Sequence, residues 1–219
     1  MDKQKFQRLL QHLPSYPNLM GKKRFFNAAV LIPMIFSGGE YHFLFQKRAA
    51  NIRQGGEICF PGGEFEADTD VSCKEAAIRE TTEELGIKKE KINILGRLDT
   101  FISPRGITVD SFIGELLISD FSGLTPDETE VEKIFSIPVS WFETNSPEEY
   151  QLKMQVNPTY LDQEGKRVDL LPIEELGLPE HYREPWSSAN YRVLIYHTPG
   201  ETVWGITAEL VKEVIEKSN

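Results

Sequence analysis

Three glutamates, Glu80, Glu83 and Glu84, are the residues whose type and spacing point most directly to chemistry. In a helix, positions i, i+3 and i+4 lie on one face, so these carboxylates converge. Like charges at this spacing repel, and a bound divalent cation would convert that repulsion into binding. Hard oxygen ligands suit Mg²⁺ or Mn²⁺, and Mg²⁺ is usually held by a few carboxylates together with substrate phosphates. The spacing therefore predicts a metal site for a phosphate-containing substrate, with a solvated acidic helix face as the alternative.

The helix that would carry these glutamates has start and stop signals in the sequence. Ser72 followed three residues later by Glu75 is typical of a capping box at a helix start. Gly86 stands just past the other end, where glycine takes the left-handed conformation at little cost. We therefore predict a helix over about 72–85, preceded by an acidic loop and a turn at 61–63.

The run from Arg79 to Ile87, RETTEELGI, resembles the second half of the Nudix box. That box has arginine and glutamate, two further residues, two glutamates, one residue, glycine and an apolar residue. Its opening glycine is present as Gly63. The common box also has an acidic residue eight positions before its arginine, where this chain has Val71, with Asp70 one residue earlier. The loop after Gly63 is longer than usual, and Thr81 occupies a position that is often apolar.

A narrower resemblance lies in the residues ahead of the box. Arg48-Ala49, Arg53 and the run FPGG at 60–63 look like the signature of coenzyme A pyrophosphatases, with a loop after Arg53 that is one residue shorter. Asp70 stands where that subfamily carries an aspartate before the box helix. The run VWGITA at 203–208 resembles the Trp-Gly-Leu-Thr-Ala run that starts the last helix of the subfamily.

The resemblance implies a fold, a reaction and roles for individual residues. Nudix proteins have an α/β fold, an α/β/α sandwich with a mixed sheet, and hydrolyse a nucleoside diphosphate linked to another group with the help of divalent ions. The subfamily resemblance implies cleavage of coenzyme A or its thioesters to 3′,5′-ADP and 4′-phosphopantetheine or its acylated form. The resemblance implies that Glu80, Glu84 and the Gly63 carbonyl bind the metal, that Glu83 is a further ligand or the base, and that Arg79 orients the glutamates.

It also implies residues that contact the substrate or approach the metal from outside the box. Arg48 and Arg53 are the candidates for binding the 3′-phosphate, with Lys47 behind them. Glu128 or Glu130 is expected to reach the metal site from a later loop.

Two alternatives remain open from the sequence. One is a Nudix hydrolase of another substrate, such as ADP-ribose, NADH or a nucleoside triphosphate, because the loop lengths depart from the subfamily pattern. The other is a Nudix-fold ligand sensor without catalysis. Such sensors can lose acids of the box, whereas this chain retains all three glutamates.

The segments on either side of the box are expected to supply the sheet. Apolar runs at about 25–36 and 41–47 flank Gly38-Gly39, which is a hairpin signal. Two further strands are expected over 92–102 and 107–118, with a turn between them.

The chain length of 219 residues suits one domain with additions. We assign 1–20 to an N-terminal helical extension that packs on the domain or on a partner subunit. Residues 21–219 are assigned to a single Nudix domain with an insertion at about 145–190. The extension is predicted from apolar residues at helical spacing, namely Phe6, Leu9, Leu10 and Leu13.

The insertion is irregular and rich in proline. Strand-like pieces at 151–156 and 167–171 are expected to form a hairpin around Gly165, inside the Nudix sheet. Insertions of this kind often shape a substrate pocket or a subunit contact, so a homodimer is compatible with the sequence.

Charge and cysteine content exclude several function classes. The net charge of −10 argues against binding to nucleic acid or to anionic membranes, which require a basic surface. The two cysteines, Cys59 and Cys73, do not have the number or spacing of a disulfide framework or zinc site. The sequence shows no secretory signal and no apolar run of membrane-spanning length. We therefore expect a cytoplasmic protein with a small-molecule substrate.

Overall fold

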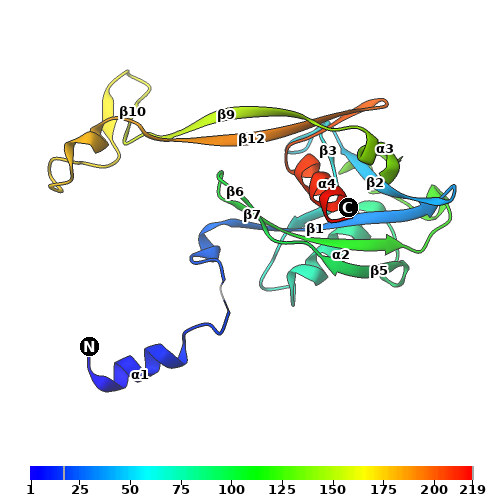
Figure 1. The fold of residues 1–219 in the computed structure, drawn as a ribbon, viewed down its shortest axis with the longest axis horizontal. Helices are drawn as coiled ribbons and strands as arrows, with labels where there is room; N and C mark the ends of the chain where they lie inside the picture. The colour runs from blue at the N-terminus through cyan, green and yellow to red at the C-terminus, as the bar shows by residue number, and fades with distance from the viewer. Residues whose placement is uncertain (17, 219) are drawn as a thin grey trace.

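Eight strands form a mixed sheet within the part of the chain that the structure describes, and helices cover both faces (Figure 1). The structure is a computed structural model that describes residues 1–16 and 18–218, without the side chains of residues 187–189. Strands β1 and β7 are parallel, and the other pairs of this sheet are antiparallel. The strands are β1 (Phe26–Ser37), β2 (Glu40–Arg48), β3 (Ile58–Cys59), β4 (Gly62–Glu64), β5 (Ile92–Arg97), β6 (Phe101–Ser103), β7 (Ile107–Leu116) and β8 (Val131–Pro138).

A hydrophobic cluster on each face holds the helices against the sheet. Successive side chains of a strand point to opposite faces, so neighbouring residues of β1 serve different clusters. Leu31 packs in the cluster that includes residues of α2 (Cys73–Leu85). Ile32 packs in the cluster that includes residues of α3 (Val139–Thr144) and α4 (Gly205–Ser218). Each such buried side chain contributes about 1.5–3 kcal/mol. The predicted α/β/α sandwich is confirmed.

The predicted hairpin of the first two strands is confirmed as β1 and β2, which pair antiparallel up to Ser37 and Glu40. Gly38 and Gly39 have φ angles of 62° and 95°. Positive φ at both central residues is the two-residue turn whose twist matches the flanking strands.

The prediction of a single strand over 92–102 is wrong, because the structure has two strands there, β5 and β6. Both pair with β7. Between them Leu98 is buried, and the Thr100 hydroxyl donates to Asp110 on β7 at 2.6 Å. These contacts turn the chain inward and interrupt the ladder. Short 3₁₀ helices lie elsewhere in the connections, at Lys22–Arg24, Lys89–Lys91, Phe121–Gly123 and Glu180–Arg183.

The insertion differs from the expectation in two ways. Strand β9 (Glu148–Val156) pairs with β12 (Trp186–Thr198), and β11 (Arg167–Asp169) pairs with β10 (Thr159–Leu161), so 151–156 and 167–171 do not form a hairpin. In the described part of the chain, β9, β12 and β13 (Glu201–Trp204) make a separate three-stranded sheet, so the insertion does not extend the Nudix sheet.

The reason for the different pairing is the alternation of side chains along both long strands. The register places Leu152 opposite Tyr191 and Tyr150 opposite Val193, which brings apolar side chains of both strands to one face. The two strands run away from the body as a ribbon and carry β10 and β11 at the far end (Figure 1).

The N-terminal helix α1 spans Lys3–Gln11, as the apolar spacing predicted. Asp2 caps it by accepting a hydrogen bond from the Lys5 N–H at 2.8 Å. No residue of α1 is buried, so the expected packing on its own domain is absent from this structure. Among the described residues, no helix combines the length and apolar character needed to cross a bilayer.

Candidate active site

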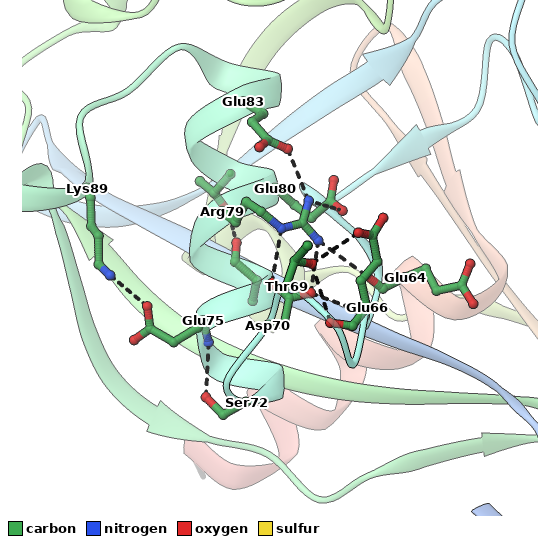
Figure 2. A network of polar contacts seen from close by, with 12 residues as sticks. Glu64, Glu66, Thr69, Asp70, Ser72, Glu75, Arg79, Glu80, Glu83 and Lys89 are labelled. Carbon is green, nitrogen blue, oxygen red and sulfur yellow. Dashed lines mark hydrogen bonds and ion pairs between the residues drawn. The ribbon is translucent and has the colours of Figure 1, made fainter. Parts of the chain in front are cut away.

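Helix α2 carries the box glutamates, and residues at both of its ends set its limits. The Ser72 hydroxyl accepts a hydrogen bond from the Glu75 N–H at 3.3 Å (Figure 2). The Glu75 carboxylate accepts from Lys89 at 2.6 Å, so only half of the predicted capping box is found. Gly86 ends the helix with φ at 60°, and a Cβ there would lie 2.0 Å from the Thr125 carbonyl oxygen. Glycine is therefore required at this position for conformation and for space.

Arg79 lies at the centre of the acidic cluster (Figure 2). Its guanidinium donates to both oxygens of Asp70, at 3.0 and 3.1 Å, and also to Glu80 at 2.9 Å and Glu83 at 3.1 Å. The pairing with Arg79 lowers the pKa of Asp70. Val71, in the position of the common acid, is 92% exposed. Asp70 therefore makes the arginine contact despite the shift of one residue.

Glu84 is the most buried of the three glutamates. Its Oε2 accepts a hydrogen bond from the Gly62 N–H at 2.9 Å, and its Oε1 lies 3.9 Å from the Arg48 guanidinium. Burial raises the pKa of Glu84 to about 7, although these two neighbours favour the charged form. Burial also raises the pKa of Glu80, against the opposing effect of Arg79.

Gly63 lies on β4, opposite Ala29 of β1. A Cβ at Gly63 would lie 2.3 Å from Glu80 Oε1. Because glycine leaves this space free, the Glu80 carboxylate packs directly against the main chain. Gly63 therefore lies beside Glu80, whereas its role as a metal ligand stays a prediction.

Gln46 is a member of the site that the sequence analysis missed. Its side chain is fully buried on β2, and its amide donates to Cys59 Sγ at 3.6 Å. The Gln46 side chain also lowers the pKa of the Glu84 carboxyl, which offsets part of the effect of burial. Burial raises the pKa of Cys59 to about 11, so this residue is a neutral thiol. The sequence feature that could have identified Gln46 is its position as a polar residue inside the apolar run that forms β2.

The basic residues assigned to the substrate phosphate have different surroundings. Arg48 donates through Nε to the Arg53 carbonyl at 3.1 Å, which ties the two arginines together beside Glu84. The Arg53 side chain is exposed and forms no ion pair with any residue that the structure describes. Lys47 is paired with Glu132 at 3.0 Å and Glu201 at 3.8 Å, and its contribution to phosphate binding behind the two arginines stays a prediction.

The predicted metal ligands make other contacts in this structure. The described residues contain no group of three or more His, Cys, Asp or Glu side chains arranged to hold a metal ion. Glu80 and Glu83 instead bind Arg79, and Glu84 binds the Gly62 N–H. The donor set nevertheless fits a hard divalent cation in its chemistry, because the oxygens are carboxylates and burial destabilises the charge of two of them. Of the two outlying acids, Glu130 is close enough to raise the pKa of Glu80 further.

Comparison with known proteins places the chain in a family. The family model described as NUDIX domain matches residues 26–192. The peroxisomal coenzyme A diphosphatase NUDT7 of Mus musculus is 27% identical over 167 residues, which cover 75% of this chain and 63% of that protein. The mitochondrial coenzyme A diphosphatase NUDT8 of Homo sapiens is 32% identical over 117 residues, which cover 52% and 49%.

A bacterial relative is matched over a larger share of its own length than the mouse and human relatives. The uncharacterized Nudix hydrolase NudL of Yersinia enterocolitica is 26% identical over 199 residues, covering 88% of this chain and 82% of that protein. The chain spans less than two thirds of the mouse and human relatives but most of the bacterial one. Because the family match extends over most of its length, this chain belongs to the NUDIX domain family.

Proposed function

We propose that this protein is a divalent-metal-dependent pyrophosphohydrolase of coenzyme A or its thioesters. The products are 3′,5′-ADP and 4′-phosphopantetheine, or acyl-phosphopantetheine from a thioester. One observation carries this proposal: Arg48, from the coenzyme A-type signature, lies 3.9 Å from Glu84 of the Nudix box. Two sequence features that are 36 positions apart in the chain thus meet at one carboxylate site.

The proposed reaction is hydrolysis of the diphosphate. Water attacks one phosphorus, the bond from that phosphorus to the bridging oxygen breaks, and the other phosphate leaves. Glu80, Glu84 and the Gly63 carbonyl would hold Mg²⁺ or Mn²⁺, which when bound neutralises phosphoryl charge and lowers the pKa of water.

The protein groups have separate tasks in this reaction. Arg79, fixed by Asp70, holds Glu80 and Glu83 on the same side of α2. Glu83 is the proposed base, because its side chain is 59% exposed and can receive a proton from the attacking water. Arg48 and Arg53 supply positive charge for the phosphates of the substrate, since a guanidinium matches phosphate geometry.

Product analysis tests the proposal. The full chain is incubated with coenzyme A and Mg²⁺ or Mn²⁺, and the products are identified by mass spectrometry. We expect 3′,5′-ADP and 4′-phosphopantetheine in equal amounts, and no cleavage in the presence of excess chelator. Absence of cleavage of coenzyme A and of its acetyl thioester would contradict the proposed substrate, and absence of cleavage of every diphosphate tested would favour a non-catalytic sensor.

A further inference from the structure

The ribbon of β9 and β12 has one apolar face that no part of the chain described by the structure covers completely. Because side chains alternate along each strand, the cross-strand register gathers the apolar residues of both strands on that face. Leu152 and Val156 are each about half exposed there. A two-stranded ribbon is marginally stable in water unless a face is packed against another element. The residues of this face that are not buried are Tyr150, Leu152, Met154, Val156 and Tyr191, whereas Val193 is buried.

Helix α1 has the same lack of partners. It has nine residues, and helices this short are marginal in isolation. Figure 1 shows α1 and the ribbon on the same side of the body, separated from each other. The apolar stripe of α1 is about half exposed and consists of Phe6, Leu9 and Leu10, with Leu13 just past the end of the helix.

The charges of the two elements are complementary. Helix α1 contains Lys3, Lys5 and Arg8 and no acidic residue, with Asp2 as its cap. Residues 157–185, at the far end of the ribbon, contain seven acidic and three basic residues. A basic segment beside an acidic one favours association and suppresses the pairing of like segments.

We propose that α1 of a second copy of this chain docks on the apolar face of the ribbon, and that two copies exchange helices about a two-fold axis. The stripe of α1 then covers the ribbon, and its lysines and arginine face the acidic end. A single nine-residue helix makes a small contact. Two-fold symmetry forms the same contact twice, which brings the total area closer to that of a stable interface.

A second copy suits the observations better than a lipid surface does. A basic amphipathic helix can bind anionic lipid, but that binding would leave the apolar face of the ribbon uncovered. It would also bring a chain with a net charge of −10 to a negative surface. The exchanged dimer covers both apolar surfaces and does not rest on the proposed hydrolase activity.

The first test is the mass of the full chain in solution by sedimentation velocity over a range of concentrations. We expect a dimer for the unmodified chain. Leu10→Asp on α1 and Leu152→Asp on the ribbon should each raise the dimer dissociation constant at least about tenfold, because each removes an apolar contact twice per dimer. Gln4→Asp and Gln151→Asp, on the opposite faces of the same elements, are the matched controls and should leave it unchanged.

Mixing the two disruptive variants separates exchange from other arrangements. A heterodimer of Leu10→Asp with Leu152→Asp retains one intact contact, so the mixture should associate more strongly than either variant alone. Because α1 buries nothing in its own chain, Leu10→Asp carries the test even if Leu152→Asp unfolds.

Three results would overturn the proposal. They are a monomeric unmodified chain at all concentrations, a dimer that neither apolar substitution weakens, and a mixture that associates no better than its components. Vesicles of phosphatidylserine and phosphatidylcholine serve as a further arm. Binding of a monomeric chain to them, lost in Leu10→Asp, would assign α1 to a membrane surface instead.

Discussion

At the scale of single residues, the three box glutamates differ in the exposed fraction of their side chains. The Glu84 side chain is 3% exposed, Glu80 is 17% and Glu83 is 59%. A buried carboxylate is costly unless charge or hydrogen bonds compensate it, and Glu84 is the one for which burial raises the pKa to about 7. Metal binding would remove this cost, so we expect Glu84 to be the ligand on which activity depends most.

Glu84→Gln keeps the shape of the side chain and removes its charge. We expect kcat to fall at least about 100-fold, because even the loss of an outer partner of a metal ligand costs 10–100-fold. Glu75→Gln is the matched control, since Glu75 lies on the same helix and contacts Lys89 outside the cluster. Steady-state kinetics with Mg²⁺, together with thermal melts of both variants, make the comparison. Near-normal turnover in a folded Glu84→Gln variant would remove Glu84 from the proposed site.

Arg53→Ala tests how the 3′-phosphate is recognised. The Arg53 carbonyl, which accepts from Arg48, is retained in the variant, so the effect should come from the lost guanidinium. A hydrogen bond to a charged group contributes about 1.5–3 kcal/mol, so KM for coenzyme A should rise about tenfold or more. KM for dephospho-coenzyme A should change much less. Equal changes for both substrates would argue against this role, and Lys23→Ala, an exposed basic residue outside the site, provides the control.

Sequence spacing was informative about residues within one helix. The helical repeat predicted that Glu80, Glu83 and Glu84 converge. The structure brings Glu80 and Glu83 together on Arg79, whereas Glu84 accepts from the Gly62 N–H. The neighbours of Glu84 could not be predicted from spacing in this way. Gln46 and the Gly62 N–H belong to strands that are brought next to the helix only by folding. The exposed Arg53 was assigned from its place in a motif alone.

At the scale of elements, a substitution of Gly86 tests whether the end of α2, the helix that carries the glutamates, requires glycine. Gly86→Ala combines a positive φ of 60° with a Cβ only 2.0 Å from the Thr125 carbonyl oxygen. We expect a loss of more than about 1 kcal/mol in the free energy of unfolding, measured by chemical denaturation. Gly123→Ala, where a Cβ meets nothing within 4 Å, should change stability little. Equal stability of the two variants would show that the helix end is not constrained in this way.

Asp110 connects β7 to the segment before β1. It is 2% exposed and accepts hydrogen bonds from Lys22 at 2.8 Å, Arg97 at 2.6 Å and Thr100 at 2.6 Å. Burial alone would raise the pKa of Asp110, but the hydrogen bonds, among them those from Lys22 and Thr100, outweigh it and lower the pKa to about 2. A depressed pKa in the folded state stabilises the protein above the unfolded pKa of about 3.9.

This stabilisation should be lost as the pH falls from about 4 towards 2. Between about pH 5 and pH 2, the free energy of unfolding should fall by about 2 kcal/mol more in the unmodified chain than in Asp110→Asn. Urea denaturation at a series of pH values gives the difference. Asp99→Asn, an exposed acid, should follow the unmodified chain. Parallel pH profiles for the unmodified chain and Asp110→Asn would contradict the shift.

Elements whose partners are close in sequence were predicted well, and those with distant partners were not. The β1–β2 hairpin and the α2 boundaries follow from glycines and a cap that act locally. The pairing of β9 with β12 spans the whole insertion. Local periodicity identifies the strands but not the partner, so 167–171 was wrongly paired with 151–156.

At the scale of the whole molecule, the proposed site lies in the body, while α1 and the ribbon project from it (Figure 1). The glutamates come from α2 and the arginines from β2 and the loop that follows it. The proposed catalysis and the proposed self-association therefore use different residues. The net charge of −10 would repel the proposed anionic substrate at long range, so the proposal requires the local positive charge of Arg48 and Arg53.

The most direct test of coenzyme A as the substrate is a competition in one vessel. Coenzyme A, dephospho-coenzyme A, ADP-ribose and NADH compete at equal concentration with Mg²⁺, and the products are followed by mass spectrometry, which gives relative kcat/KM values. We predict that 3′,5′-ADP from coenzyme A forms fastest, with dephospho-coenzyme A second. Faster cleavage of ADP-ribose or NADH would retain the glutamate site and contradict the assignment of coenzyme A as the substrate.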